Sequence, residues 1–161
     1  MHDPFSDINK HGVIAIPALL WAIILFEARG WILAFFGFVS AVIGSREASG
    51  LISGDSWQPI LIAELLALLV LWAALRRTPD GGELPRWLWR HGQAFICLAA
   101  ASHVAWALLR HAQAAAWMAW HDDQRLLLSI ADALIALGIW LSAHARAVFQ
   151  EFPPPPPAKA P

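Results

Sequence analysis

The chain has 161 residues, of which 58% are hydrophobic and 14% are charged, and its formal net charge at pH 7 is −1. Soluble domains carry about 25% charged residues, so this deficit indicates a protein that has lipid as part of its solvent. A net charge so close to zero provides no broad basic surface, which excludes nucleic acid as an expected partner. The single cysteine, Cys97, allows no intrachain disulfide and no cysteine-based metal site.

Residues 1–12 form a polar segment that lacks both a basic stretch and a small-residue cleavage site, so we expect no cleaved signal peptide. Four apolar segments follow, each long enough to cross a bilayer: residues 13–43, 57–75, 93–109 and 126–143. The predicted fold class is therefore all-α, an integral membrane bundle of four transmembrane helices within residues 13–146.

The first apolar segment is unusually long. With a rise of 1.5 Å per residue it extends for about 45 Å, whereas the hydrocarbon core of a bilayer is about 30 Å thick. Such a helix must tilt, protrude, or break near Pro17 or at the polar step from Glu27 to Gly30. We expect one long helix that begins at the membrane interface.

Lysine and arginine outside the apolar segments are unevenly distributed. One side carries Lys10, Arg76, Arg77, Arg86, Arg90, Arg146 and Lys159, and the other carries Arg46, Arg110 and Arg125. The positive-inside rule then predicts that residues 1–12, the second loop and the C-terminus are cytoplasmic. The short sequence RWLWR at 86–90 is expected to lie along the cytoplasmic interface, with its tryptophan rings among lipid headgroups.

The C-terminal region, residues 147–161, contains five consecutive prolines. Proline lacks the backbone N–H that a helix interior requires, and a short proline run is an extended, solvated structure. We therefore predict a disordered cytoplasmic tail from residue 147 onward.

Five ionisable residues lie inside the apolar segments: Glu27, Arg29, Glu64, His103 and Asp132. An arginine at mid-membrane costs roughly 2.5–3.5 kcal/mol on insertion scales, so Arg29 requires partners. Glu27 and Arg29 project about 200° apart on a helix and do not simply neutralise each other. Glu64, His103 and Asp132 lie at similar predicted depth, about 9–11 Å below the outer boundary, which makes Glu64 and Asp132 the expected partners of Arg29.

The charges of this group do not balance if all three carboxylates are ionised. The excess requires a protonated acid, a charged His103 or a bound cation. One interpretation is structural, with polar groups holding the helices together; the other is a proton or cation relay. We favour the structural interpretation.

Small residues mark a second feature of the first segment. They recur every three or four positions and form a helix-packing stripe: Gly30, Ala34, Gly37, Ala41 and Gly44. Such a stripe allows a second helix to approach closely.

No GxSxG, P-loop or HExxH motif occurs, so we expect no enzymatic activity. We also expect no metal site and no cofactor. A bis-histidine haem, for example, needs a second histidine opposite His103, whereas the other histidines lie near or beyond predicted helix ends.

One resemblance covers about the first third of the chain. The residues that carry it are Asp7, Ile8, Asn9, Lys10, His11, Gly12, Pro17, Trp21, Arg29, Trp31, Ser40 and Gly44. This pattern resembles the YfeZ-like family of uncharacterised bacterial inner-membrane proteins. The resemblance implies a multi-pass protein of the bacterial inner membrane and assigns no activity.

The expected function is that of an accessory or scaffold protein in a larger membrane complex. Its expected partners are the lipid bilayer and either another membrane protein or further copies of the chain. The alternative is a small proton- or cation-coupled transporter subunit that uses the buried ionisable residues.

Overall fold

The computed structural model describes residues 8–9, 11–42, 58–113 and 119–155. Within these residues the chain forms seven helices and no strand, and a single isolated bridge joins Ile8 to Ile14. The predicted all-α fold class is confirmed.

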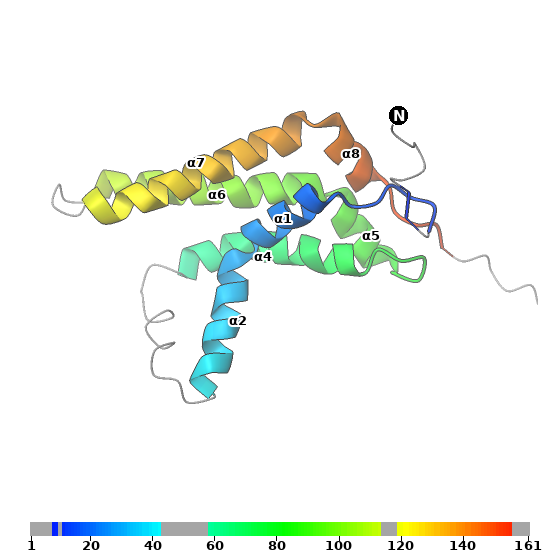
Figure 1. Cartoon of the computed structure of the whole chain (residues 1–161), viewed down its shortest axis with the longest axis horizontal. Coiled ribbons are helices and arrows are strands. Elements are labelled where there is room, and N and C mark those ends of the chain that lie inside the picture. Colours follow the sequence, from blue (N-terminus) through cyan, green and yellow to red (C-terminus); the bar gives the residue numbers. More distant parts are fainter. Residues whose placement is uncertain (1–7, 10, 43–57, 114–118, 156–161) are drawn as a thin grey trace, which may run out of the picture.

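Three long helices lie side by side along the long axis of the molecule: α4 (Gln58–Leu75), α6 (Gly92–Gln113) and α7 (Ala119–Leu141) (Figure 1). The short helix α1 (Ala18–Glu27) packs against α4 and α6. The α4 and α6 helices face each other through buried small residues such as Ala67, Ala73 and Ala99, which permit a close approach. Ile24, Val70 and Ile96 fill the core between them.

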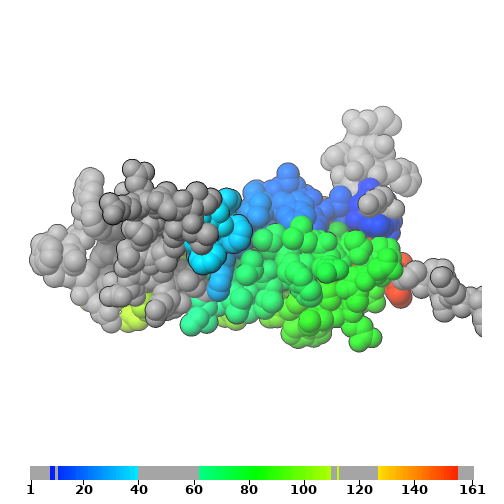
Figure 2. Space-filling view, turned by 90° about the horizontal axis from the view of Figure 1, so that it is seen from below, coloured from blue at the N-terminus to red at the C-terminus, as the bar shows by residue number. Residues whose placement is uncertain are grey.

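The first apolar segment is broken, so the expected single helix over residues 13–43 is wrong. Helix α1 begins only at Ala18, directly after an extended Pro17, and ends at Glu27. Helix α2 (Arg29–Val42) then leaves at 64° to α1 and projects away from the long helices (Figure 1). Figure 2 shows α1 in blue and α2 in cyan along one edge of the green surface of α4 to α6.

Side chains replace backbone hydrogen bonds at this break. Ala28 has φ −94° and ψ 9°, outside the regular helical range. The guanidinium of Arg29 donates to the carbonyl of Phe26 at the end of α1, at 2.9 Å. The N–H of Trp31 at the start of α2 donates to Glu64 Oε2 at 3.2 Å. Because these side chains satisfy helix-end groups, the chain bends without leaving these two groups unpaired.

Helix α7 begins at Ala119, before the predicted start at residue 126, and ends at Leu141. A second break follows it. Helix α8 (Ala143–Gln150) continues at a bend of 73°. The Ser142 hydroxyl accepts a hydrogen bond from the N–H of Ala145 at 3.1 Å and so caps α8. Arg146 donates to the carbonyl of Trp140 at 3.4 Å. At the first break, Arg29 donates to the carbonyl of Phe26 in the same way.

The prediction that a disordered tail starts at residue 147 is therefore wrong. Residues 147–150 belong to α8, and Val148, Phe149 and Pro153 are buried. The apolar side chains of α8 pack on α5, α6 and α7, which offsets the entropy of ordering this segment. Residues 156–161 lie outside the described part of the chain.

Segments from both ends of the sequence meet at one end of the bundle, near α5 and α8 (Figure 1). Arg77 donates to the carbonyl of Ile14 at 2.6 Å and to the carbonyl of Glu151 at 3.0 and 3.2 Å. Glu151 Oε2 in turn accepts from the N–H of Ile14 at 2.7 Å. We call these three residues the end cluster. Arg77, which the charge count treats as a free cytoplasmic cation, is buried, and this burial lowers the pKa of its guanidinium.

Helix α5 (Glu83–Arg90) places only part of its aromatic surface outside. Its inner face carries Pro85, Leu88 and Trp89, all buried. The indole N–H of Trp89 donates to the carbonyl of Val148 at 2.9 Å, whereas about half of the Trp87 surface is exposed. The expectation that both rings lie among headgroups is therefore wrong for Trp89, because helical periodicity turns it into the core.

Among the described residues one helix is long and apolar enough to cross a membrane, namely α6 over Gly92–Leu109. The α1–α2 and α7–α8 pairs also pass this test when each bent pair is taken as one span, which raises the number to three. The described apolar part of α4, Ile62–Leu75, is shorter. The helices are thus compatible with a multi-pass membrane protein.

Candidate functional site

The five ionisable residues of the apolar segments meet at the break between α1 and α2. Glu27 ends α1, Arg29 begins α2, Glu64 comes from α4, His103 from α6 and Asp132 from α7. We call these five residues the polar cluster. Four of them are buried, and only the Arg29 side chain, which is 25% exposed, reaches the surface.

Arg29 binds Asp132 through both carboxylate oxygens, each at 3.1 Å. Its guanidinium also lies 4.2 Å from the centre of the Phe26 ring. A bidentate arginine–carboxylate pair is stronger and more directional than a single contact. Of the two acids expected to pair with Arg29, only Asp132 forms this ion pair among the described residues.

Glu64 instead joins the start of α2 to His103. Its Oε2 accepts from the N–H of Trp31, and its Oε1 lies 3.4 Å from His103 Nε2. A carboxylate at a helix N-terminus satisfies an otherwise free N–H and lies at the positive end of the helix dipole.

Gly30 leaves the space that Glu64 occupies. A Cβ atom at this position would lie 2.8 Å from Glu64 Cδ and 2.9 Å from Oε1, closer than real Cβ contacts allow. In the rest of the predicted stripe, Gly37 is buried and Ala34 is half-buried. The side chain of Ala41 and all of Gly44 lie outside the described residues.

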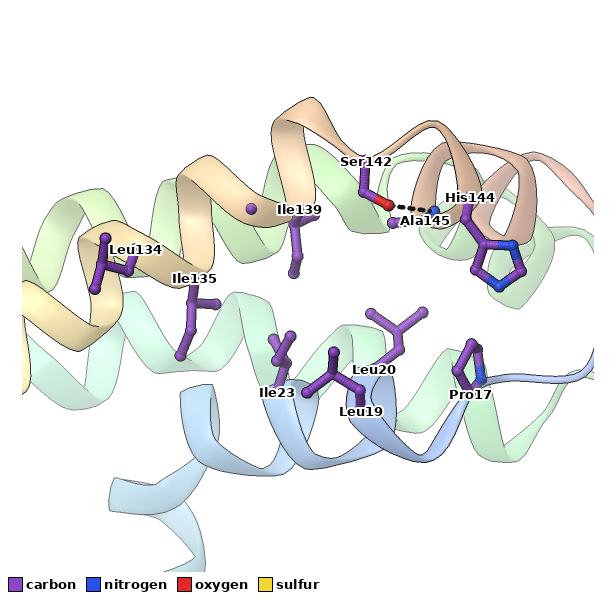
Figure 3. Close-up of a pocket in the computed structure, with 11 residues that line it drawn as sticks. Pro17, Leu19, Leu20, Ile23, Leu134, Ile135, Ile139, Ser142, His144 and Ala145 are labelled. Carbon is purple, nitrogen blue, oxygen red and sulfur yellow. Dashed lines mark hydrogen bonds between the residues drawn. The ribbon is translucent and has the colours of Figure 1, made fainter.

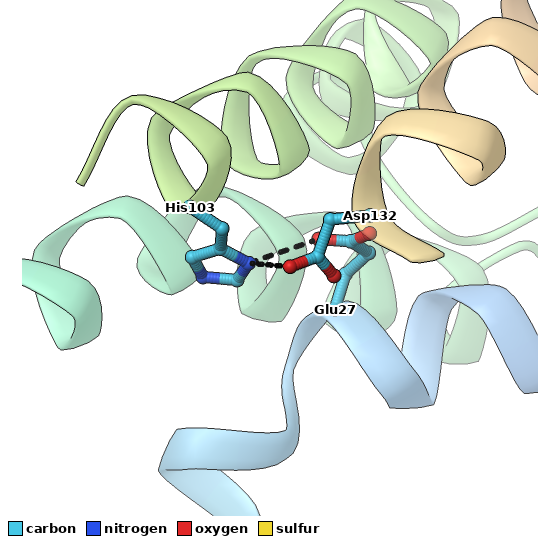
Figure 4. Close-up of side chains that lie close together, drawn as sticks. All are labelled: Glu27, His103 and Asp132. Carbon is cyan, nitrogen blue, oxygen red and sulfur yellow. Dashed lines mark ion pairs between the residues drawn. The ribbon is translucent and has the colours of Figure 1, made fainter. Parts of the chain in front are cut away.

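Glu27, His103 and Asp132 converge from three different helices (Figure 4). His103 Nδ1 lies 3.6 Å from Glu27 Oε2, 3.4 Å from Asp132 Oδ2 and 3.4 Å from the Nη2 of Arg29. Both oxygens of the fully buried Glu27 lack a hydrogen-bond donor among the described residues. His103 Nε2 also has no hydrogen-bond partner among them. This part of the polar cluster is the least satisfied.

The polar cluster carries an excess of negative charge. Three ionised carboxylates and one guanidinium leave two negative charges when the imidazole is neutral. Burying net charge is expensive, so the group needs further positive charge from protons or from a cation. The arrangement can therefore hold protons or bind a cation, in addition to joining five helices.

A groove runs beside the polar cluster, between α1 and the bend from α7 to α8 (Figure 3). Its volume is about 410 Å³, and all but two of its lining residues are apolar or glycine, the exceptions being Ser142 and His144. Ile23 and Ile135 line the end nearest the polar cluster, each about one helical turn from Glu27 or Asp132. The groove is therefore suited to an apolar occupant.

Sequence reasoning missed the end cluster and the buried Trp89. Arg77 and Glu151 lie in polar stretches that give no local sign of burial. The apolar pattern of Ala145, Val148 and Phe149, at helical spacing, is the signal that would have predicted a packed C-terminal helix.

In the part of the chain that the structure describes, the fold and the site together define an all-helical protein with a buried carboxylate–histidine–arginine cluster and one helix long and apolar enough to cross a membrane. Comparison with protein-family models, with curated proteins and with solved structures finds no match.

Proposed function

We propose that the chain is an accessory or scaffold protein of the bacterial inner membrane, which it crosses four times with a broken first span. In this proposal the polar cluster joins the helices, and the projecting helix α2 engages a partner within the bilayer. The kinship with the YfeZ-like family is part of the same proposal.

The outer surface of the helices supports a lipid environment. Large apolar side chains are exposed along every long helix, for example Ile62 on α4, Leu98 on α6 and Leu134 on α7. Water-facing helices normally carry polar residues on their outer side. An apolar outer face around a polar centre is the arrangement expected of a protein in lipid.

The end cluster supports an even number of membrane crossings between Ile14, Arg77 and Glu151. Ile14 precedes the first span, Arg77 follows the second and Glu151 follows the fourth, yet their groups are hydrogen-bonded to one another. These contacts support a topology in which all three positions lie on the same side of the membrane. The positive-inside rule makes that side the cytoplasm.

The exposed apolar side chains of the projecting helix α2 are the single observation that supports the accessory role. Leu33, Phe35, Phe36 and Phe38 are each more than half exposed, and α2 stands at 64° to α1. A helix with so many exposed aromatic residues offers a large apolar contact area to a neighbouring helix.

The contacts of the polar cluster favour a joint over a conduction path. Arg29, Glu64 and Asp132 each make hydrogen bonds that hold the break between α1 and α2 or tie it to another helix. The groove beside the polar cluster is apolar and does not stabilise a hydrated ion.

A proton- or cation-coupled transporter subunit is the second candidate. The carboxylate of Glu27, which has no hydrogen-bond donor among the described residues, favours it, because transport requires a group that is free to take up and release a positive charge. Liposomes that contain the purified protein test this role. If the protein accelerates the dissipation of a proton or cation gradient and Glu27→Gln abolishes this effect, the transporter role replaces the accessory role.

Cysteine labelling tests the topology. In a Cys97→Ser background, Thr78→Cys should react with a membrane-impermeant maleimide only after permeabilisation. Ser53→Cys, which lies outside the described residues, should react in intact spheroplasts. The reverse pattern, or reaction of both positions from one side, contradicts the four-span arrangement.

Photocrosslinking tests the accessory role. A photoreactive phenylalanine at Phe36 of α2 should form one discrete protein adduct in native membranes. The same group at Leu98 of α6, which is similarly exposed, should label mainly lipid. If Phe36 also labels lipid alone, α2 has no protein partner and the accessory role fails.

A further inference from the structure

Three acceptor atoms face one another in the centre of the polar cluster: Glu27 Oε2, His103 Nδ1 and Asp132 Oδ2 (Figure 4). Each comes from a different helix, and the three lie within 4.8 Å of one another. Two carboxylate oxygens at this separation repel each other unless a positive species lies between them.

The role of His103 Nδ1 depends on the tautomer of the ring. Nδ1 lies 3.4 Å from Arg29 Nη2, which can only donate, and 3.4 and 3.6 Å from two carboxylate oxygens, which accept when ionised. A metal site here requires the tautomer with the ring proton on Nε2, which lies 3.4 Å from Glu64 Oε1. The single lone pair of Nδ1 is then directed to the ion, and Arg29 stays bound to Asp132.

A metal-bound histidine binds the ion through one nitrogen and directs its other N–H toward a carboxylate, which holds the ring in place. Glu64 is placed for that role: its Oε1 lies 3.4 Å from Nε2, and the N–H of Trp31 holds its second oxygen. The Nε2–Glu64 contact is not a formed hydrogen bond in this structure.

The two distances from His103 to the carboxylate oxygens also fit. With metal–ligand bonds of 2.0–2.2 Å, neighbouring ligands of a tetrahedral ion lie about 3.3–3.6 Å apart. His103 Nδ1 is 3.6 Å from Glu27 Oε2 and 3.4 Å from Asp132 Oδ2. One nitrogen and two carboxylate oxygens form a donor set that suits zinc and neighbouring divalent transition metals.

A divalent cation would also neutralise the polar cluster. With a neutral imidazole the five residues carry two negative charges, and a dication adds two positive ones. Arg29 remains compatible with the ion because a carboxylate has about four lone-pair positions. Asp132 can thus accept from Arg29 and still offer a lone pair of Oδ2.

We propose that Glu27, His103 and Asp132 bind one divalent transition-metal ion, with Glu64 and Arg29 orienting the ligands. The site is independent of the accessory role, since a metal-stabilised joint serves a scaffold and a transporter alike. It places a cation against Glu27 Oε2, which has no hydrogen-bond donor among the described residues.

Cobalt titration tests the site directly. The full chain, purified in detergent with a tag that lacks histidine, is stripped with a chelator and titrated with Co²⁺. We expect about one equivalent to bind, with visible absorption bands that report inner-sphere nitrogen and oxygen ligands. Zn²⁺ should displace the Co²⁺ and should raise the melting temperature. No saturable binding by the wild-type chain overturns the proposal, and two protons then neutralise the polar cluster.

Matched variants locate the ion. Glu27→Gln keeps the shape of the side chain and should weaken Co²⁺ binding at least about tenfold, and Glu64→Gln should weaken it about 10- to 100-fold. His103→Gln should remove the nitrogen-dependent bands. Glu83→Gln and His144→Gln change exposed residues outside the polar cluster and should leave binding unchanged. Equal binding by Glu27→Gln and the wild-type chain overturns the assignment.

Discussion

Arg29 donates to both carboxylate oxygens of Asp132 at 3.1 Å, although 103 residues separate the two in the sequence. The same guanidinium caps the last turn of α1 through the Phe26 carbonyl. One side chain therefore closes the end of α1 and ties the start of α2 to α7. The same side chain therefore contributes both to the bend of the first apolar segment and to its attachment to the bundle.

Replacing Arg29 by methionine removes this tie and leaves Asp132 buried without its cation. We expect a loss of about 3–5 kcal/mol in the free energy of unfolding. Arg29→Met combined with Asp132→Asn should recover part of the loss, because the stranded charge is then absent. The measurement is a double-mutant cycle from denaturant unfolding in detergent.

Glu83→Gln is the control for that cycle, since Glu83 is exposed on α5 and lies outside the polar cluster. Its effect should add to that of Arg29→Met with little coupling. Strict additivity in the Asp132 cycle would refute the ion pair.

Gly30→Ala places a Cβ against the carboxylate of Glu64. We expect destabilisation by about 1–3 kcal/mol, because overpacking forces Glu64 away from the N–H of Trp31. Thermal melting measures the change. At Gly138 a Cβ meets no heavy atom within 4 Å, so Gly138→Ala should be neutral or should stabilise by up to about 1 kcal/mol through helix propensity. Equal effects at the two glycines would contradict the close approach of Gly30 to Glu64.

Arg77→Met removes the donors to the carbonyls of Ile14 and Glu151. We expect a loss of about 1.5–3 kcal/mol, concentrated at the end cluster, because charged hydrogen bonds to buried acceptors are lost. Hydrogen exchange should rise in residues 11–17 and 143–153 and remain unchanged in the middle of α6. Arg76→Met alters the exposed neighbour and should leave both segments protected. Uniform exchange changes along the chain would argue against a local role for Arg77.

Trp89→Phe keeps an aromatic ring but removes the indole N–H that donates to Val148. The carbonyl of Val148 is then buried without this partner, and we expect destabilisation by about 1–3 kcal/mol. Trp87→Phe changes a half-exposed ring on the same helix and should cost much less. Melting temperatures of the two variants decide between a core and an interfacial Trp89, since an interfacial ring would make the two losses similar.

Local sequence patterns predict much of the helical framework. The apolar runs that became α4, α6 and α7 are read from hydropathy and helical periodicity, which depend only on neighbouring residues. The same patterns identify which ionisable residues lie inside apolar helices, since Glu27, Glu64, His103 and Asp132 stand out against apolar neighbours. Helix ends were less accurate: α7 begins earlier than expected, and α6 extends beyond residue 109.

The sequence by itself thus determined the helical class, the positions of the long helices and the identity of the polar residues within them, because each follows from local propensity and hydropathy. Only the tertiary structure decided that the first segment breaks at Ala28, that Arg29 pairs with Asp132, and that Arg77 and Trp89 are buried. The physical reason is the same in each case. The hydrogen-bond partner comes from a distant helix or terminal segment, and no local pattern specifies which distant group will accept or donate.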